Sequence, residues 1–175
     1  MAATRSGVGA CSIRAVQTRY VDGITIRPLR DGDTAPVEAL FARLGPHSRV
    51  RRFGAAKPRL TAAELAELAR VDRDRHVLVG YVDGDAEPAG VARLVRAGDA
   101  AEIAVAVADE HQGRGVGTAL ARQLAADALA AGIRELHATV TGDNPPVVSL
   151  LRRLAISLRE RWVGGQREFV VRLVP

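Results

Sequence analysis

The sequence predicts an α/β (α+β) fold built on one mixed sheet, with antiparallel strands first, a parallel pair at its centre and about four flanking helices. Apolar runs at residues 76–82, 89–95 and 103–108 are separated by short turns, which is typical of an antiparallel meander. A stretch with helical periodicity then leads to a further strand-like run at residues 136–141. A strand–helix–strand succession implies a right-handed crossover, so the last two of these strands are expected to be parallel.

The 175 residues are expected to form a single domain over residues 21–175, preceded by a flexible segment over residues 1–20. Hydrophobic residues make up 47% and charged residues 26%, which is typical of a globular protein. The segment 1–20 contains arginines but no acidic residue, and its apolar residues are too sparse for the core of a secretory signal.

The elements before the meander are short. Residues 24–29 alternate between apolar and polar side chains, which predicts a strand. An apolar stripe from Val37 to Leu44 predicts a helix that ends at Gly45. Thr61 begins a capping-box pattern and predicts a second helix through Ala69. Between these helices, residues 47–59 are rich in arginine and form either a solvated surface or an electropositive rim.

Residues 101–131 contain the most informative pattern. The valine-rich run Ile103–Ala108 predicts a buried strand, and from Thr118 onward the apolar residues recur at helical spacing. Gly113, Gly115 and Gly117 lie in the turn between the two. Glycines let backbone N–H groups approach an anion, and a helix N-terminus adds unpaired donors, so this turn predicts a phosphate site. The spacing fits neither the dinucleotide fingerprint nor the P-loop, and an ordinary glycine-rich turn is the alternative.

The last third of the chain completes the sheet. Gly132 supplies a cap for the central helix, and the strand over residues 136–141 follows it. Asn144 precedes two prolines and is a good N-cap for a helix that extends to Leu154. Two final strands are predicted at residues 158–163 and 167–173, on either side of the turn Gly164-Gly165.

The run Gln112-Gly113-Arg114-Gly115-Val116-Gly117 matches the pattern Q-x-x-G-x-G, and through it the chain resembles the GNAT superfamily of N-acetyltransferases. The order of the predicted elements from Ile24 to Leu173 is also the order found in that superfamily. A weaker resemblance to bacterial protein lysine acetyltransferases of the Pat type is carried by residues 48–53, 74–77 and 144–154.

The resemblance implies that acetyl-CoA is the co-substrate. Main-chain N–H groups of the loop would bind its pyrophosphate, which involves Gln112, Gly113, Arg114, Gly115, Val116, Gly117 and Thr118. The side chain of Arg114 either adds positive charge there or points to solvent. The main chain of Val105, Ala106 and Val107 would pair with the pantetheine arm, with the N–H of Ala106 facing the thioester carbonyl. Asn144 occupies a position that often lies close to the cofactor in the family.

Glu102 is the expected catalytic base. An amine with a pKa near ~10.4 is protonated at neutral pH, so transfer of an acetyl group to it needs a proton acceptor. Glu102 has the position and context of the catalytic glutamate in the histone-acetylating and Pat-type branches, and desolvation on the strand would raise its pKa. Alternatively, Glu102 is an exposed side chain at the start of the strand without a catalytic role. Asp109, Glu110 and His111 are the alternative bases, and they lie at the far end of the strand.

The predicted function is therefore direct transfer of an acetyl group from acetyl-CoA to a primary amine, without a covalent enzyme intermediate. The acceptor is a protein lysine or a small-molecule amine, and a catalytically inactive CoA-binding regulatory module is the alternative from another class. Many GNAT enzymes have a tyrosine as general acid where this chain has Leu151, a difference shared with Pat-type members. A thiol with a pKa near ~8.5 is a tolerable leaving group without such help.

The amino-acid composition limits the kinds of partner that the protein is expected to bind. The net charge of +5 favours anionic partners, but aromatic residues make up only 3%, so a primary role in nucleic-acid binding is disfavoured. No apolar run approaches the ~20 residues of a membrane helix, and the expected location is the cytoplasm, as a monomer or homodimer. Cys11 is the single cysteine, and the four histidines lack metal-ligand spacing, so no metal site is predicted.

Overall fold

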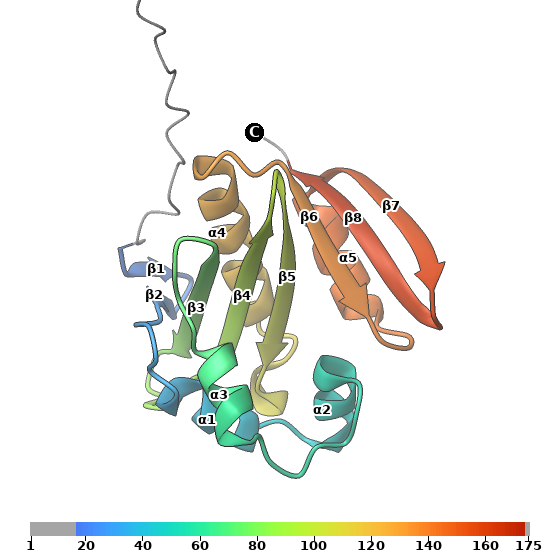
Figure 1. Cartoon of the computed structure of the whole chain (residues 1–175). Coiled ribbons are helices and arrows are strands. Elements are labelled where there is room, and N and C mark those ends of the chain that lie inside the picture. The colour runs from blue at the N-terminus through green and yellow to red at the C-terminus, as the bar shows by residue number, and fades with distance from the viewer. Residues whose placement is uncertain (1–16, 174–175) are drawn as a thin grey trace, which may run out of the picture.

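One mixed sheet of eight strands, in the order β1-β2-β3-β4-β5-β6-β8-β7, forms the framework of the protein (Figure 1). The computed structural model describes residues 17–173. The elements in chain order are β1 (Arg19–Val21), β2 (Ile24–Pro28), α1 (Ala35–Ala42), α2 (Pro46–Phe53), α3 (Ala62–Leu68), β3 (Arg75–Val82), β4 (Gly90–Ala97), β5 (Ala100–Val107), the 3-10 turn η1 (Asp109–His111), α4 (Val116–Ala130), β6 (Glu135–Val140), α5 (Pro145–Leu154), β7 (Ala155–Val163) and β8 (Gln166–Leu173).

The predicted fold class is confirmed. Strands β1 to β5 pair antiparallel in sequence order, and α4 connects β5 to β6, which is its parallel neighbour. The last two strands pair with each other, and β8 lies next to β6. A central parallel pair inside an otherwise antiparallel sheet is the arrangement that the strand–helix–strand succession predicts.

Two elements differ from the prediction. The basic stretch after Gly45 folds into the separate helix α2, because Pro46 begins it and Gly54 ends it in a left-handed conformation with φ 73°. Five α-helices therefore cover the described part of the sheet, rather than about four. Arg19 and Tyr20, assigned to the flexible segment, form part of strand β1. Residues 1–16 of that segment lie outside the described residues.

The two faces of the sheet are covered by different helices (Figure 1). Helices α4 and α5 pack on one face and enclose the larger apolar core, which includes Leu120, Leu124 and Leu151. Helices α1 and α3 lie on the opposite face, over a smaller core that contains Val77 and Val79 of β3. Side chains alternate between these faces along a strand. On β5, the odd-numbered residues therefore face α4, and Glu102, Ala104 and Ala106 face the side of α1 and α2.

The N-terminus of α3 has both hydrogen bonds of the predicted capping box. Thr61 Oγ1 accepts from the N–H of Glu64 at 3.2 Å, and the Glu64 carboxylate accepts from the N–H of Thr61 at 2.9 Å. Lys57 also donates to this carboxylate. These donors, Lys57 first and then Thr61, lower the pKa of Glu64 from 4.5 to about 2.

The stabilising effect of Glu64 is expected to disappear in acid. A carboxylate whose pKa is lower in the folded state than in the unfolded state stabilises the fold above its unfolded pKa. That contribution is lost as the pH falls from 4.5 toward 2. The free energy of unfolding of the wild type should therefore exceed that of Glu64→Gln at neutral pH, and the two should converge in acid. Urea unfolding across this range measures the difference, with Glu87→Gln as an exposed control. A difference in unfolding free energy between the two proteins that stays the same at every pH would contradict the stabilising role assigned to the Glu64 carboxylate.

Candidate functional site

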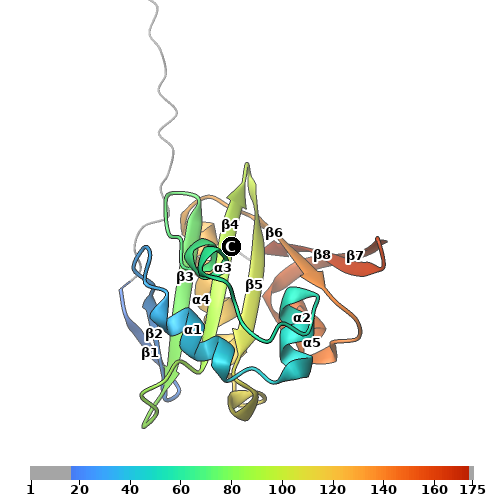
Figure 2. The same ribbon diagram turned by 60° about the horizontal axis from the view of Figure 1, so that its bottom comes forward.

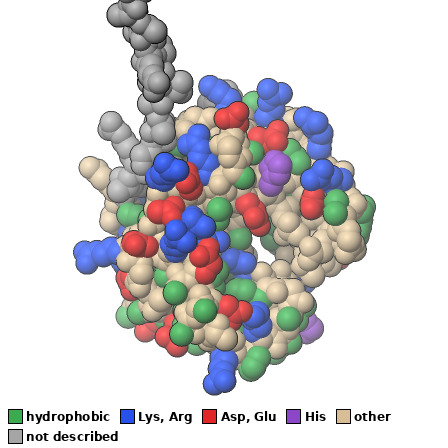
Figure 3. All heavy atoms as spheres, in the orientation of Figure 1, with side chains coloured by type: hydrophobic (Ala, Val, Ile, Leu, Met, Phe, Trp, Pro, Cys, Tyr) green, Lys and Arg blue, Asp and Glu red, His purple; other side chains and the backbone are tan. Residues whose placement is uncertain are grey.

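The sheet opens at its centre. Strands β5 and β6 pair only where Ala100, Ala101 and Glu102 lie beside Glu135, Leu136 and His137, and the remainder of each strand has no partner on this side within the described chain. In Figure 1 the two strands separate toward α2, and Figure 3 shows that the molecular surface is hollowed at the same place. Unpaired backbone groups on a strand edge are a template for an extended ligand.

The main-chain groups of β5 that face this opening belong to Val105 and Val107. Ala108 donates its N–H to the carbonyl of Ala89 at 2.9 Å, which is on the β4 side. Donors alternate between the two sides of a strand, and β5 pairs with β4 without a register shift, so the N–H of Ala106 also faces β4. The carbonyl of Val107 points the other way and accepts from Gln112 Nε2 at 3.2 Å. The N–H of Ala106 therefore faces away from the opening, and those of Val105 and Val107 face it, because the direction of the backbone groups alternates with each residue.

The glycine loop leads from the end of β5 to the N-terminus of α4. Gly113 and Gly115 have φ of 74° and 88°, a left-handed conformation that favours glycine. Gly117 serves a different purpose, since a Cβ there would lie 3.3 Å from Cγ2 of Val107, a contact so tight that this side chain would have to shift. Residues 116–118 form the first turn of α4, so their N–H groups have no partner one turn earlier in the helix. The side chain of Val116 is buried and leaves only its backbone for binding.

Gln112 fastens this loop to the strand and to α2. Its side-chain amide donates to the carbonyl of Val107, to Ser48 Oγ at 3.1 Å and to Asp109 Oδ1 at 3.1 Å. Asp109 in turn accepts from the N–H of Gly45 at 3.2 Å. The predicted cofactor ligand Gln112 is thus a residue that positions the loop, and its side-chain hydrogen bonds all go to other parts of the protein.

A second network, centred on Arg43, holds η1 in place. Arg43 donates to Asp85 and to Glu110 at 2.6 Å each, and Asp85 also lies 2.9 Å from Nε2 of the buried His111. The hydrogen bond from Arg43 lowers the pKa of Asp85 well below its usual range, and the same bond raises the pKa of Arg43. Nδ1 of His111 lies 3.0 Å from Nη1 of the exposed Arg114. Sequence reasoning missed this network, which joins residues far apart in the chain.

The two networks bear on the choice of base. Asp109, Glu110 and His111 all have hydrogen-bond partners that support the loop. Glu102 lies elsewhere, at the last position of β5 that pairs with β6, between Val95 of β4 and His137 of β6. Its side chain is exposed, so the desolvation expected from its place in a strand is not provided by the described residues. Glu102 borders the opening, and no hydrogen bond or ion pair from the described residues occupies its carboxylate.

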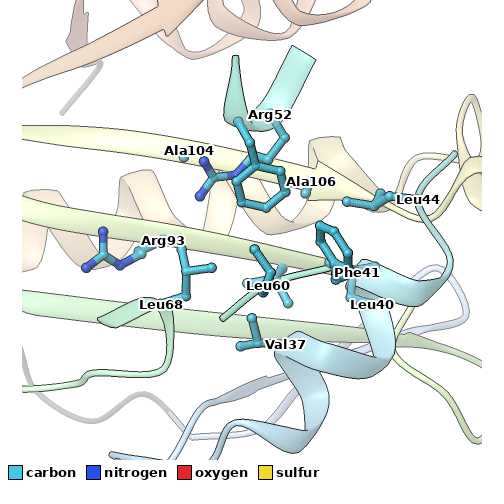
Figure 4. Close-up of a pocket in the computed structure, with 12 residues that line it drawn as sticks. Val37, Leu40, Phe41, Leu44, Arg52, Leu60, Leu68, Arg93, Ala104 and Ala106 are labelled. Atoms are coloured by element: carbon cyan, nitrogen blue, oxygen red, sulfur yellow. The ribbon is translucent and has the colours of Figure 1, made fainter. Parts of the chain in front are cut away.

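Helix α2 closes the opening on the face that carries Glu102. Both views place α2 beside the space between β5 and β6 (Figures 1 and 2). An apolar pocket lies between α1, α2, β4 and β5 (Figure 4). Arg52 and Arg93 are its charged members, and the other lining residues are Val37, Leu40, Phe41, Leu44, Phe53, Leu60, Leu68, Val91, Ala104 and Ala106.

Asn144 and Leu151 belong to the segment after β6 that forms α5. Asn144 is the N-cap of α5, but its side chain makes no capping hydrogen bond, so its amide remains available. Leu151 is 2% exposed and belongs to the core between α5 and α4. This side chain holds α5 against the core and has no access to the opening. The residue that replaces the usual tyrosine therefore has a packing role.

Within residues 17–173, no group of three or more potential ligand side chains is placed to hold a metal ion. None of the helices in the same residues combines the length and the apolar character that crossing a bilayer requires.

An opened mixed sheet, with a glycine loop and a helix N-terminus beside the free strand edge, defines an enzyme class that binds a phosphate-bearing acyl carrier. Residues 46–155 match the Acetyltransferase (GNAT) family, and the chain belongs to that family. The resemblance stated from the Q-x-x-G-x-G loop is thereby confirmed, as is acetyl-CoA, which GNAT acetyltransferases use as co-substrate.

Similar proteins include bacterial acetyltransferases. The chain is 32% identical over 150 residues to Acetyltransferase Pat of Mycolicibacterium smegmatis, an alignment that covers 83% of this chain and 45% of that protein. It is 42% identical over 91 residues to Mycothiol acetyltransferase of Nocardia farcinica, covering 50% of this chain and 28% of the relative. The chain therefore spans less than half the length of both. The crystal structure of the GNAT domain of S. lividans PAT is similar with a TM-score of 0.77 at 28% identity, over 86% of this chain and 90% of that domain.

Proposed function

We propose that this chain transfers an acetyl group from acetyl-CoA directly to a primary amine, with Glu102 as the general base. The observation that carries the proposal is the arrangement around the opening of the sheet. The loop 112–118 offers main-chain donors at one end of it, the free edge of β5 runs along it, and Glu102 lies where β5 and β6 begin to separate. A pyrophosphate, a pantetheine arm and a reacting amine would occupy these places in that order.

The reaction requires the amine to lose a proton before it attacks. Glu102 accepts this proton, and the neutral nitrogen forms a bond to the thioester carbonyl carbon. The tetrahedral oxyanion is stabilised by a main-chain N–H on the edge of β5, from Val105 or Val107. The C–S bond then breaks and its electron pair leaves with the sulfur, while the nitrogen, positively charged since its attack, loses its second proton to water, which gives the neutral amide. The thiolate takes a proton from solvent, because the position of the usual acid is occupied by Leu151 in the core.

The acceptor is a protein lysine or a small-molecule amine. The Pat-type resemblance at residues 48–53 and 144–154 favours a protein lysine, whereas the similarity to an enzyme named for mycothiol favours a small molecule. A regulatory module that binds CoA without catalysis is the remaining alternative. Turnover distinguishes this alternative from an enzyme. A regulatory module would show no acetyl transfer, and loss of Glu102 would leave its affinity for the cofactor unchanged.

Calorimetric titration with acetyl-CoA, followed by detection of free thiol with lysine peptides and small amines, tests the proposal. Micromolar binding with amine-dependent thiol release is the expected result. Binding without release for every amine would favour the regulatory module. Absence of binding would contradict the assignment of residues 112–118 to the pyrophosphate.

A further inference from the structure

Arg52 is a charged side chain that lines the apolar pocket, and it takes no part in the hydrogen-bond networks of Gln112 and Arg43. It extends from α2 across β5, and Figure 4 shows its guanidinium beside Ala104. Its neighbours there are the ring of Phe53 at 5.0 Å and the charges of Arg93 and Glu102. Among the described residues, no hydrogen bond or ion pair reaches this guanidinium, although burial lowers the pKa of Arg52 and Arg93 lowers it further.

The other arginine on the inner side of α2 is arranged differently. Arg49 donates to four main-chain carbonyls, of Leu44, Phe41, Lys57 and Pro58, at 2.7 to 3.3 Å, and stacks on the ring of Phe41. Such a side chain is a structural clamp. The partners of Arg49 come from the end of α1 and from the segments on either side of α2, and none of these carbonyls accepts from Arg52.

Arg93, on β4, adds a second unpaired donor to the same pocket. Its Nη2 donates to Glu67 at 2.7 Å, but its Nε is buried and has no hydrogen-bond partner. A buried donor without a partner is unfavourable by about 1–3 kcal/mol, and two neighbouring guanidinium groups repel each other. Glu102 is near Arg52 but forms no ion pair with it within the described chain. An anion bound beside Arg52 would offset the repulsion between the two guanidinium groups.

We propose that the acceptor amine of this enzyme carries a carboxylate, which is bound by Arg52 with Arg93 beside it. The inference rests on the acetyl transfer proposed above and names its substrate class. The planar guanidinium matches a carboxylate better than any other common anion on a small amine, because both oxygens can accept in parallel. The site belongs to the acceptor and not to the cofactor, because Arg52 lies on the Glu102 face, whereas the phosphate loop is at the start of α4.

Glu102 and Arg52 would then act on different parts of one molecule. The carboxylate of the acceptor is held by Arg52 over Ala104, and the amine lies toward the edge of β5, where Glu102 removes its proton. Two sources supply this chemistry: a free amino acid or related small amine, and a lysine side chain with an acidic neighbour in a peptide. Both present an amine and a carboxylate within the reach of one site.

The test compares matched acceptors on the full chain. Thiol release from acetyl-CoA is measured with free amino acids and their carboxamides, and with lysine peptides in which the neighbouring residue is glutamate or glutamine. The wild type is expected to prefer the carboxylate member of a pair in kcat/KM. Arg52→Met should lower kcat/KM for that member by about 10- to 100-fold, mainly through KM, and leave the other member nearly unchanged. Arg51→Gln, an exposed arginine on the same helix, is the charge control.

The outcomes separate the carboxylate site from the proposed reaction. Equal rates for both members of every pair in the wild type would overturn the carboxylate site. An equal loss on both members in Arg52→Met, with a changed pH profile of kcat, would also overturn it, because Arg52 would then act by positioning Glu102. If acetyl-CoA binds but no amine releases thiol, the reaction itself is wrong. Titration of the matched pairs into the CoA-loaded protein then decides the carboxylate site alone, and binding that is indifferent to the carboxylate overturns it.

Discussion

Replacing Glu102 by glutamine is expected to lower kcat for amine acetylation by about 10²- to 10⁴-fold, the usual contribution of a positioned general base. The affinity for acetyl-CoA should stay within error of the wild type, because the side chain of Glu102 lies on the opposite side of β5 from the α4 face and away from the loop 112–118. The loss should shrink as the pH rises toward the pKa of the acceptor, about 10.4 for a lysine, since the amine then loses its proton to solvent.

Steady-state rates of thiol release across the pH range, together with calorimetry for acetyl-CoA, measure these quantities. Glu135→Gln is the matched control, because it removes a carboxylate from the neighbouring strand β6 without touching the loop or the pocket around Arg52. A kcat in Glu102→Gln similar to that of the wild type would exclude Glu102 as the base. Asp109, Glu110 and His111 would then have to be reconsidered despite their structural hydrogen bonds.

The glycine loop is predictable from the sequence because each of its requirements is local. Gly113 and Gly115 adopt a left-handed backbone, and a Cβ at Gly117 would crowd the side chain of Val107. These requirements concern residues that are close together in the sequence. They therefore produce a spacing pattern that can be recognised without a structure. The same is true of the capping box at Thr61, whose two hydrogen bonds both lie within one helical turn.

Contacts between distant segments leave no such pattern. Arg43 joins Asp85 and Glu110 across separations of 42 and 67 residues, and no spacing rule connects these positions. Likewise, the basic stretch 47–59 does not reveal which arginine turns inward. On a two-turn helix, the direction of Arg52 depends on how α2 docks against β5, which is set by the tertiary packing. Strand β1 has only three residues, too few to display an alternating pattern.

Substituting Gly115 with valine is expected to weaken acetyl-CoA binding by about 10- to 100-fold. Gly115 has φ 88°, and a β-branched residue in this region costs about 1–3 kcal/mol, so the loop would leave its path to relieve the strain. In the proposed function, the N–H groups at the start of α4 would bind a pyrophosphate only while they point toward the same place. A small change of path therefore separates donors that act together, and the loss appears in the dissociation constant for acetyl-CoA measured by calorimetry.

Gly165→Val provides the comparison that separates local strain from a general loss of folding. Gly165 has a similar φ of 81°, but it lies in the turn between β7 and β8 at the far edge of the sheet (Figure 1). Both variants carry the same steric conflict, so both should lose similar stability in urea unfolding, while only Gly115→Val should lose affinity for acetyl-CoA. Equal affinity in the two variants would place the pyrophosphate elsewhere. The free edge of β5 does not depend on Gly115, so such a result would leave the proposed contact with the pantetheine arm unaffected.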